Sequence, residues 1–123
     1  MTPPRDLELT LLARDDIADL LDASVETFGP IARGRHEVLI AVALADVCGD
    51  PGRAGSVERP ELGEGTRTYH LRHSRDRART EQGKVAEPRH LLVYELPDAR
   101  RLRVLRVLHE AMDLERHVPR RDF

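Results

Sequence analysis

The spacing of hydrophobic residues changes about halfway along the chain. In the first half, either Asp15 or Asp16 can cap a helix, and apolar side chains then recur every three or four positions, at Ile17, Leu20, Leu21, Val25 and Phe28. Gly29-Pro30 ends this first predicted helix, because glycine favours a helix C-terminus and proline cannot continue a helix. Residues 7–12 alternate at first and predict a short strand ahead of it.

A second helix is predicted from about Ile31 to Cys48. Its middle, residues 38–45, is continuously apolar and is also compatible with a buried strand. The length of the run, its three alanines and the sequence Gly-Asp-Pro-Gly at 49–52 favour a helix. Two helices joined by one or two residues form a hairpin.

The second half of the chain predicts three strands, at 66–73, 90–96 and 102–108. Pro97-Asp98-Ala99 separates the last two and carries residue types that favour turns. Strict alternation in the last strand places Arg106 on one face with Leu102, Val104 and Leu108, and Arg103 on the other with Leu105 and Val107. Apolar residues on both faces predict an inner strand.

The elements follow one another as an N-terminal strand, a two-helix hairpin and a three-stranded antiparallel run. This order predicts a single α+β domain over residues 1–123, with two helices on a small, mostly antiparallel sheet. Residues 50–65, rich in Gly and Pro, are expected to form a linker without regular structure. Residues 73–89 are polar and charged and predict an exposed, mobile hairpin tip. A tail at 115–123 follows, with a short turn of helix before Pro119.

Charge divides the chain into two unequal halves. Residues 1–65 contain 6 Lys and Arg against 13 Asp and Glu, a net charge of −7, whereas residues 66–123 contain 14 against 9, a net charge of +5. Five of the six histidines also lie in the second half. This asymmetry favours a basic face with an acidic partner or a nucleic-acid neighbour, although each charge can equally well solvate its own surface.

Composition narrows the cellular setting. The single cysteine, Cys48, excludes an internal disulfide and fits a reducing compartment, where we expect it to be a core residue. No apolar run approaches the length of a membrane span, and the N-terminus lacks a signal segment. These features predict a cytoplasmic protein that does not associate with a membrane.

Arginines and histidines gather on and beside the three predicted strands of the second half. If these strands pair, they form a basic platform that can hold phosphates or carboxylates of a partner; its members are Arg67, Arg72, Arg89, Arg103, Arg106, His70, His73, His90 and His109. The alternative is that each arginine pairs with a local carboxylate such as Glu95 or Asp113. We expect Arg106 to lie on the open face of the sheet and to serve in binding.

The sequence predicts no metal ion and no cofactor. His70 and His73 are three positions apart, so on a strand they point to opposite faces, and no Cys or Asp completes a ligand set. A glycine-rich phosphate loop is also absent from the sequence.

The end of the chain resembles a known family. The run Arg-Val-Leu-His-Glu-Ala-Met-Asp-Leu at 106–114, preceded by Arg-His-Leu-Leu-Val-Tyr at 89–94, is similar to the closing segment of the RelE/ParE toxins of bacterial toxin–antitoxin pairs. The resemblance is greatest to the ParE branch and extends over almost the whole chain. It implies the same α+β fold, a cognate antitoxin (ParD-like or another small antitoxin) in a hetero-oligomer with the toxin, and DNA gyrase as the target that is poisoned by binding.

Together, the basic platform and the resemblance give the candidate residues. Those for binding the antitoxin or the target are Arg67, Tyr69, Arg72, Arg89, His90, Arg103, Arg106, His109 and Asp113, and no catalytic residue is assigned. The RelE branch cleaves ribosome-bound messenger RNA; in that alternative Arg67 and Arg106 resemble phosphate-binding arginines, and His90 or Tyr94 transfers protons. The acidic linker and the single lysine, Lys84, argue against a surface for ribosomal RNA. A third possibility is a module that keeps the fold and antitoxin binding but not toxicity.

Overall fold

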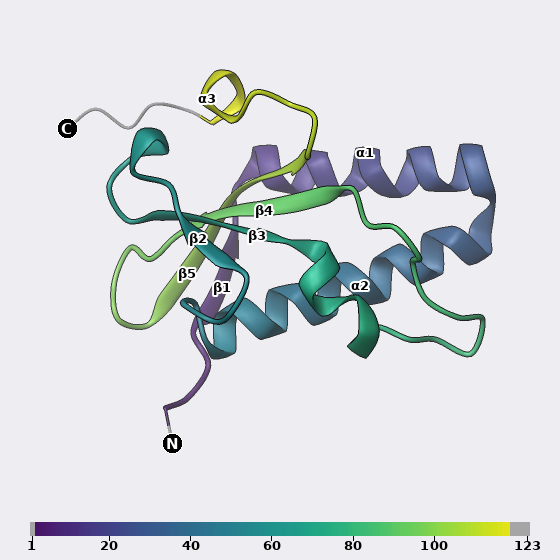
Figure 1. The fold of residues 1–123 in the computed structure, drawn as a ribbon, viewed down its shortest axis with the longest axis horizontal. Coiled ribbons are helices and arrows are strands. Elements are labelled where there is room, and N and C mark those ends of the chain that lie inside the picture. Colours follow the sequence, from purple (N-terminus) through teal and green to yellow (C-terminus); the bar gives the residue numbers. More distant parts are fainter. Residues whose placement is uncertain (1, 119–123) are drawn as a thin grey trace.

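The computed structural model describes residues 2–118 and shows two long helices on one face of a five-stranded sheet (Figure 1). The sheet has the strand order β1-β5-β4-β3-β2, with β1 parallel to β5 and the other neighbours antiparallel. In chain order the elements are β1 (Asp6–Leu9), α1 (Leu11–Phe28), α2 (Pro30–Gly49), β2 (Ser56–Glu58), η1 (Pro60–Leu62), β3 (Thr66–His70), η2 (Leu71–Arg77), β4 (His90–Glu95), β5 (Arg101–His109) and α3 (Leu114–His117), where η marks a 3₁₀ helix. The predicted α+β fold, with its two-helix hairpin, is confirmed.

The first helix begins earlier than the apolar spacing predicts. The hydroxyl of Thr10 accepts a hydrogen bond of 3.0 Å from the backbone N–H of Ala13 and donates one to the carbonyl of Leu105. Thr10 therefore ends β1, caps α1 and ties both to β5, so the prediction of Asp15 or Asp16 as the cap is wrong. At the other end Gly29, with φ of +89°, turns the chain directly into α2, a backbone conformation that favours glycine.

Strand β5 is an inner strand, as predicted, but it carries a bulge that changes the direction of its side chains. Val93 of β4 pairs with Arg106, whereas the next residue, Tyr94, pairs with Val104, so Leu105 is the extra residue. Val104 and Val107 consequently both pack toward the helices, and Leu105 packs on the opposite side. The predicted alternation holds up to Leu105 and is wrong beyond it, because the bulge shifts the phase of the strand and places Val107 and Leu108 on the faces opposite to those predicted.

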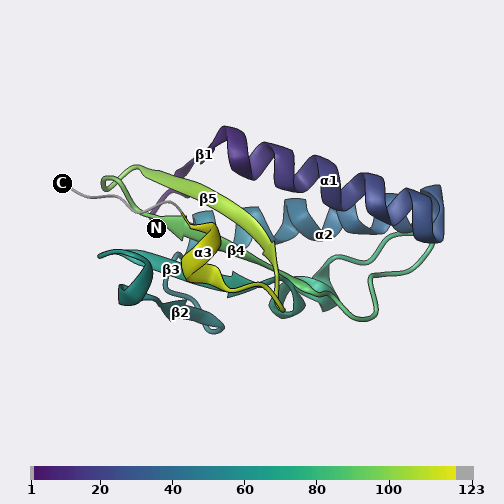
Figure 2. The same ribbon diagram turned by 90° about the horizontal axis from the view of Figure 1, so that it is seen from above.

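The sheet has an apolar cluster on each face. The larger cluster joins both helices to the sheet and includes Leu39, Ala43, Tyr69, Leu92, Tyr94 and Val104. The smaller cluster lies on the other face and is covered by the chain around η1 and α3; it contains Leu62, Leu91, Val93, Leu105, Leu108 and Val118. Figure 2 shows α1 and α2 on one side of the sheet and α3 on the other. The predicted helical turn in the tail is thus α3, while residues 119–123 lie outside the described part of the chain.

Residues 73–89 do not form an exposed hairpin tip throughout, and that prediction is wrong for the first part of the segment. The chain leaves β3 into η2, which packs against α2, and Ser74, Ala78 and Pro88 of this segment are buried. The side chain of Asp46 on α2 holds η2 by accepting hydrogen bonds from Ser74 and Arg77. Exposed side chains occur both before and after residue 78, and beyond it one isolated bridge joins Thr80 and Gly83.

The expected linker at 50–65 also contains regular structure. Strand β2 pairs with β3, with Ser56 opposite Tyr69, and forms one edge of the sheet. The helix η1 follows and places Leu62 in the smaller apolar cluster. A three-residue strand leaves too short a hydrophobic pattern to be recognised from sequence alone.

Candidate functional site

The predicted basic platform does not form as a single surface. Four of its five arginines have a carboxylate partner: Arg67 pairs with Glu58, Arg89 with Glu87 and Glu110, Arg103 with Glu8 and Glu95, and Arg106 with Asp16. The fifth, Arg72, is exposed, and no carboxylate of the described residues lies within ion-pair distance of it. Local pairing, which the sequence left as the alternative, therefore accounts for most of these charges.

Arg106 lies at the open edge of β5 beyond the end of β1. Strand β1 pairs with β5 only as far as Val104, and Asp16 on α1 occupies the position that follows. The two oxygens of Asp16 accept hydrogen bonds of 2.8 Å from Nε and Nη2 of Arg106, and one also accepts from the backbone N–H of Val107 at 2.9 Å. The third guanidinium nitrogen donates to the carbonyl of His117 at 2.8 Å. The prediction that Arg106 faces open surface is wrong, because a carboxylate of the same chain holds it.

Arg103 and Arg67 lie near opposite edges of the sheet. Arg103 bridges β1 and β4 by donating to Glu8 at 2.9 Å and to Glu95 at 3.0 Å. Hydrogen bonds from Arg101 and then Arg103 lower the pKa of Glu8. Arg67 donates to the hydroxyl of Ser56 on the edge strand β2 at 2.6 Å. Both arginines therefore join neighbouring strands.

A second group of charged side chains lies where β4 begins and β5 ends. Glu110 accepts hydrogen bonds from Nε2 of His70 at 2.9 Å and from Arg89 at 3.0 Å, which lower its pKa, with Arg89 as the larger cause. The other ring nitrogen of His70 accepts from the backbone N–H of Arg72 and caps η2. Asp113 in turn caps α3 by accepting from the N–H of Glu115. These contacts organise the local chain.

Tyr69 was predicted to bind a partner, and Tyr94 was suggested for RNA cleavage. Both predictions are wrong, because both side chains are 0% exposed and cannot contact a partner or a substrate. The hydroxyl of Tyr69 bonds to Ser74, and that of Tyr94 bonds to Ser56 and to the carbonyl of Pro51. Burial raises the pKa of Tyr94, an effect that the hydrogen bond to Ser56 only partly opposes.

The residues suggested for RNA cleavage are not brought together. Arg67 lies on β3 and is bonded to β2, whereas Arg106 lies on β5 and is bonded to α1, on the far side of β4. Tyr94 is buried, and His90 lies at the opposite end of β4 from Tyr94. The structure therefore offers no single position at which all four side chains could surround one phosphate.

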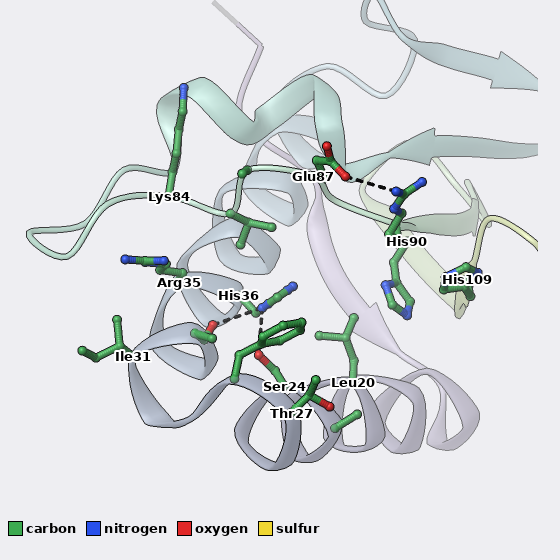
Figure 3. A pocket seen from close by; sticks show the side chains of 16 residues that line it. Leu20, Ser24, Thr27, Ile31, Arg35, His36, Lys84, Glu87, His90 and His109 are labelled. Atoms are coloured by element: carbon green, nitrogen blue, oxygen red, sulfur yellow. Dashed lines mark hydrogen bonds and ion pairs between the residues drawn. The ribbon is translucent and has the colours of Figure 1, made fainter.

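A concave surface lies between the helix hairpin and the chain leading into β4. We call it the helix-hairpin groove; its volume is about 890 Å³, and its lining includes Leu20, Ser24, Phe28, Ile31, Arg35, His36, residues 84–87, Arg89, His90 and His109. Figure 3 shows Leu20, Ser24 and Thr27 of α1 along one side, Lys84 and Glu87 on the opposite side, and His90 and His109 at one end. Three predicted binding residues, Arg89, His90 and His109, thus meet here.

Sequence reasoning did not find this groove. Its apolar rim comes from Phe28 and Ile31, which flank the Gly29-Pro30 turn and are 75% and 56% exposed. The sequence did contain one indication of the groove, namely two large apolar residues beside a turn. Side chains at the tip of a helix hairpin have little core to pack against, so large apolar residues there are expected to be exposed. The sequence pattern instead assigned Phe28 to the buried face of α1.

The histidines of the groove contact one another and neighbouring polar groups. His90 and His109 pack edge to face, with ring centroids 5.2 Å apart. Burial, followed by the proximity of His109 and His36, lowers the pKa of His90 to about 4. The ring of His36 lies 3.1 Å from the hydroxyl of Ser24 and 3.0 Å from the carbonyl of Ala32, which fix its orientation.

His, Cys, Asp and Glu side chains between residues 2 and 118 form no group of three or more that could hold a metal ion. None of the helices in the same range has the length and apolar character needed to cross a lipid bilayer.

The order of the elements, with an N-terminal strand, a helix hairpin and then antiparallel strands in one sheet, is consistent with the fold expected of RelE/ParE toxins. A family model described as the ParE toxin of the type II toxin–antitoxin system parDE matches residues 7–114. The chain therefore belongs to the ParE toxin family, and as a type II toxin it has an antitoxin partner. Comparison with curated proteins gives no match.

Proposed function

We propose that this ParE-family toxin inhibits growth by binding and poisoning DNA gyrase in the cytoplasm, and that a ParD-like antitoxin encoded beside it neutralises it. Membership of the ParE family supports the choice of target. The antitoxin joins the toxin in a hetero-oligomer and keeps it inactive until the antitoxin is removed.

One observation favours gyrase binding over RNA cleavage. The four residues suggested for cleavage, Arg67, His90, Tyr94 and Arg106, are not brought together in the structure. Cleavage of a phosphodiester requires a proton-transfer group within reach of the scissile phosphate, but Tyr94 is sealed in the core. Binding to RNA also requires cations that are free to neutralise phosphates, whereas Arg67 and Arg106 are already ion-paired. These contacts favour a toxin that acts by binding.

Controlled expression tests this proposal. Induction of the toxin alone is expected to stop growth and to switch on a DNA-damage reporter, because a poisoned gyrase leaves broken DNA. Co-expression of the neighbouring reading frame is expected to restore growth. Growth arrest with an inactive damage reporter and cleaved messenger RNA would support the ribonuclease alternative, and normal growth despite folded toxin would support a module without toxicity.

A further inference from the structure

We propose that the helix-hairpin groove is a docking site for one segment of the antitoxin, and that this segment presents bulky apolar side chains together with a carboxylate that pairs with Arg35. The inference rests on the proposed function for the identity of the partner and adds where and how the partner binds. Three features support it: the exposed apolar rim, the guanidinium of Arg35 without a carboxylate partner among the described residues, and a groove wall at residues 84–87 that contacts within this chain hold in place.

The apolar rim is the first part of the argument. Phe28 and Ile31 project from the tip of the helix hairpin while remaining 75% and 56% exposed. Leu20 and Val85 line the same groove, so apolar side chains belong to its lining as well as to its rim. An exposed apolar surface of this kind on a small protein indicates a binding site, because its removal from water stabilises a complex.

The charge of the groove indicates what the partner carries. Three cations line it, but Lys84 pairs with Asp76, and Arg89 pairs with Glu87 and Glu110. Arg35 differs, because none of the carboxylates in the described part of the chain lies within ion-pair distance of it. Its guanidinium donates only to the carbonyl of Gln82, and its Nε has no hydrogen-bond partner among the described residues. A carboxylate from the partner would supply the missing countercharge.

The far wall of the groove comes from the segment that the sequence suggested to be mobile. Asp46 anchors the start of this segment through Ser74 and Arg77. Further contacts hold the wall itself: Arg75 donates to the carbonyl of Ala86, and Lys84 donates to Asp76 at 2.6 Å. The groove is therefore formed before the partner arrives, which reduces the entropy lost on binding. Because residues 84–87 shape one side of it, this segment helps to select the cognate antitoxin.

The experiment measures binding of the full-length toxin to the product of the neighbouring reading frame by isothermal titration calorimetry. The toxin is co-expressed with that protein, separated from it in denaturant and refolded. The test variants are Phe28→Ser and Arg35→Glu, with Arg35→Lys as the conservative version. The matched controls are Leu11→Ser and Arg14→Glu, which change an 80% exposed leucine and an exposed arginine near the start of α1, away from the groove.

We expect Phe28→Ser and Arg35→Glu each to weaken binding about tenfold or more, Arg35→Lys to weaken it less, and both controls to stay within about twofold of the parent. Parent-like affinity of a folded Phe28→Ser variant and a folded Arg35→Glu variant would overturn the inference. If Arg35→Glu does not fold, hydrogen exchange of the parent complex decides: protection of the amides of residues 84–87 supports the groove, and unchanged exchange there overturns it. Failure of the parent toxin to bind the neighbouring protein would instead contradict the proposed partner.

Discussion

Asp16 on α1 and Arg106 on β5 form a two-point ion pair, with both nitrogen–oxygen distances at 2.8 Å, at the place where β1 stops. Asp16 also accepts the N–H of Val107, so one carboxylate replaces the strand that would otherwise continue along this edge. The side chains are only 17% and 12% exposed. The pair therefore attaches the first helix to the central part of the sheet.

The first prediction concerns this ion pair. Replacement of Arg106 by alanine is expected to lower the free energy of unfolding by about 3 kcal/mol, because it leaves the largely buried carboxylate of Asp16 without its countercharge. Urea unfolding measures the loss. The control is Arg116→Ala, which removes an exposed pair with Asp113 and should leave stability unchanged. Equal stability of the two variants would mean that the pair is not formed in solution.

The second prediction concerns Asp46. Burial opposes its ionisation, but hydrogen bonds from Arg77 and Ser74 and the charge of Arg53 outweigh this effect and lower its pKa. Asp46→Ala should cost about 3 kcal/mol, since Ser74 and two arginines lose a common partner. Proteolysis should then cut within residues 71–88 well before the rest of the chain. A variant that resists cleavage as the parent does would show that η2 is held by other contacts.

The third prediction separates a structural role of Tyr94 from a catalytic one. Tyr94→Phe removes hydrogen bonds to Ser56 and to the carbonyl of Pro51, at 2.7 and 2.5 Å, and is expected to cost about 1 to 2 kcal/mol of stability. Growth inhibition at a temperature where the variant is folded should equal that of the parent. A folded Tyr94→Phe protein that has lost toxicity would instead point to proton transfer by this hydroxyl.

The fourth prediction is a pH dependence that originates at His90. Because the pKa of His90 falls from 6.5 to about 4 on folding, the unfolded chain binds a proton between these values that the folded chain does not. Stability is therefore unaffected above about pH 6.5, decreases as the pH falls toward 4, and changes no further below it from this source. The expected decrease is about 1 to 2 kcal/mol, since one pKa unit corresponds to about 1.4 kcal/mol and the partial exposure of the His90 ring to solvent reduces the effect.

The variant His90→Gln isolates this contribution. Other groups with lowered pKa, such as Asp46 and Glu110, also lose stabilising charge interactions as the pH falls, so the parent alone cannot identify the source. The difference in unfolding free energy between parent and variant should change between pH 7 and pH 4 by the amount given above. A pH-independent difference would contradict the account of His90.

The sequence predicted the helices and the last two strands well because their apolar patterns are long. β5, for example, has Leu102, Val104, Leu105 and Val107 in one run that fits only an inner strand. It did not predict the bulge at Leu105, since an extra residue leaves the composition of a strand unchanged and appears only when the strand is paired. Nor did it predict Thr10 as a cap, because its side chain was assigned to a strand.

The candidate site was predicted less well, for a physical reason. Residue type indicates charge but not its partner: Arg106 meets Asp16 from 90 positions away, and this pairing depends on how α1 crosses the edge of the sheet. Likewise, the helix-hairpin groove arises where Phe28 and residues 84–87 approach each other, and neither segment carries a motif. Arg89, His90 and His109 were chosen as candidates because His90 and His109 lie on strands that the sequence predicts and Arg89 directly precedes one of them.

The measurement that tests the central claim most directly is the effect of the purified toxin on purified DNA gyrase with a supercoiled plasmid. We predict that the toxin makes gyrase accumulate double-strand breaks in the plasmid, and that addition of the neighbouring antitoxin prevents them, while messenger RNA on programmed ribosomes stays intact. Unaltered gyrase activity together with cleavage of the ribosome-bound messenger RNA would contradict the account.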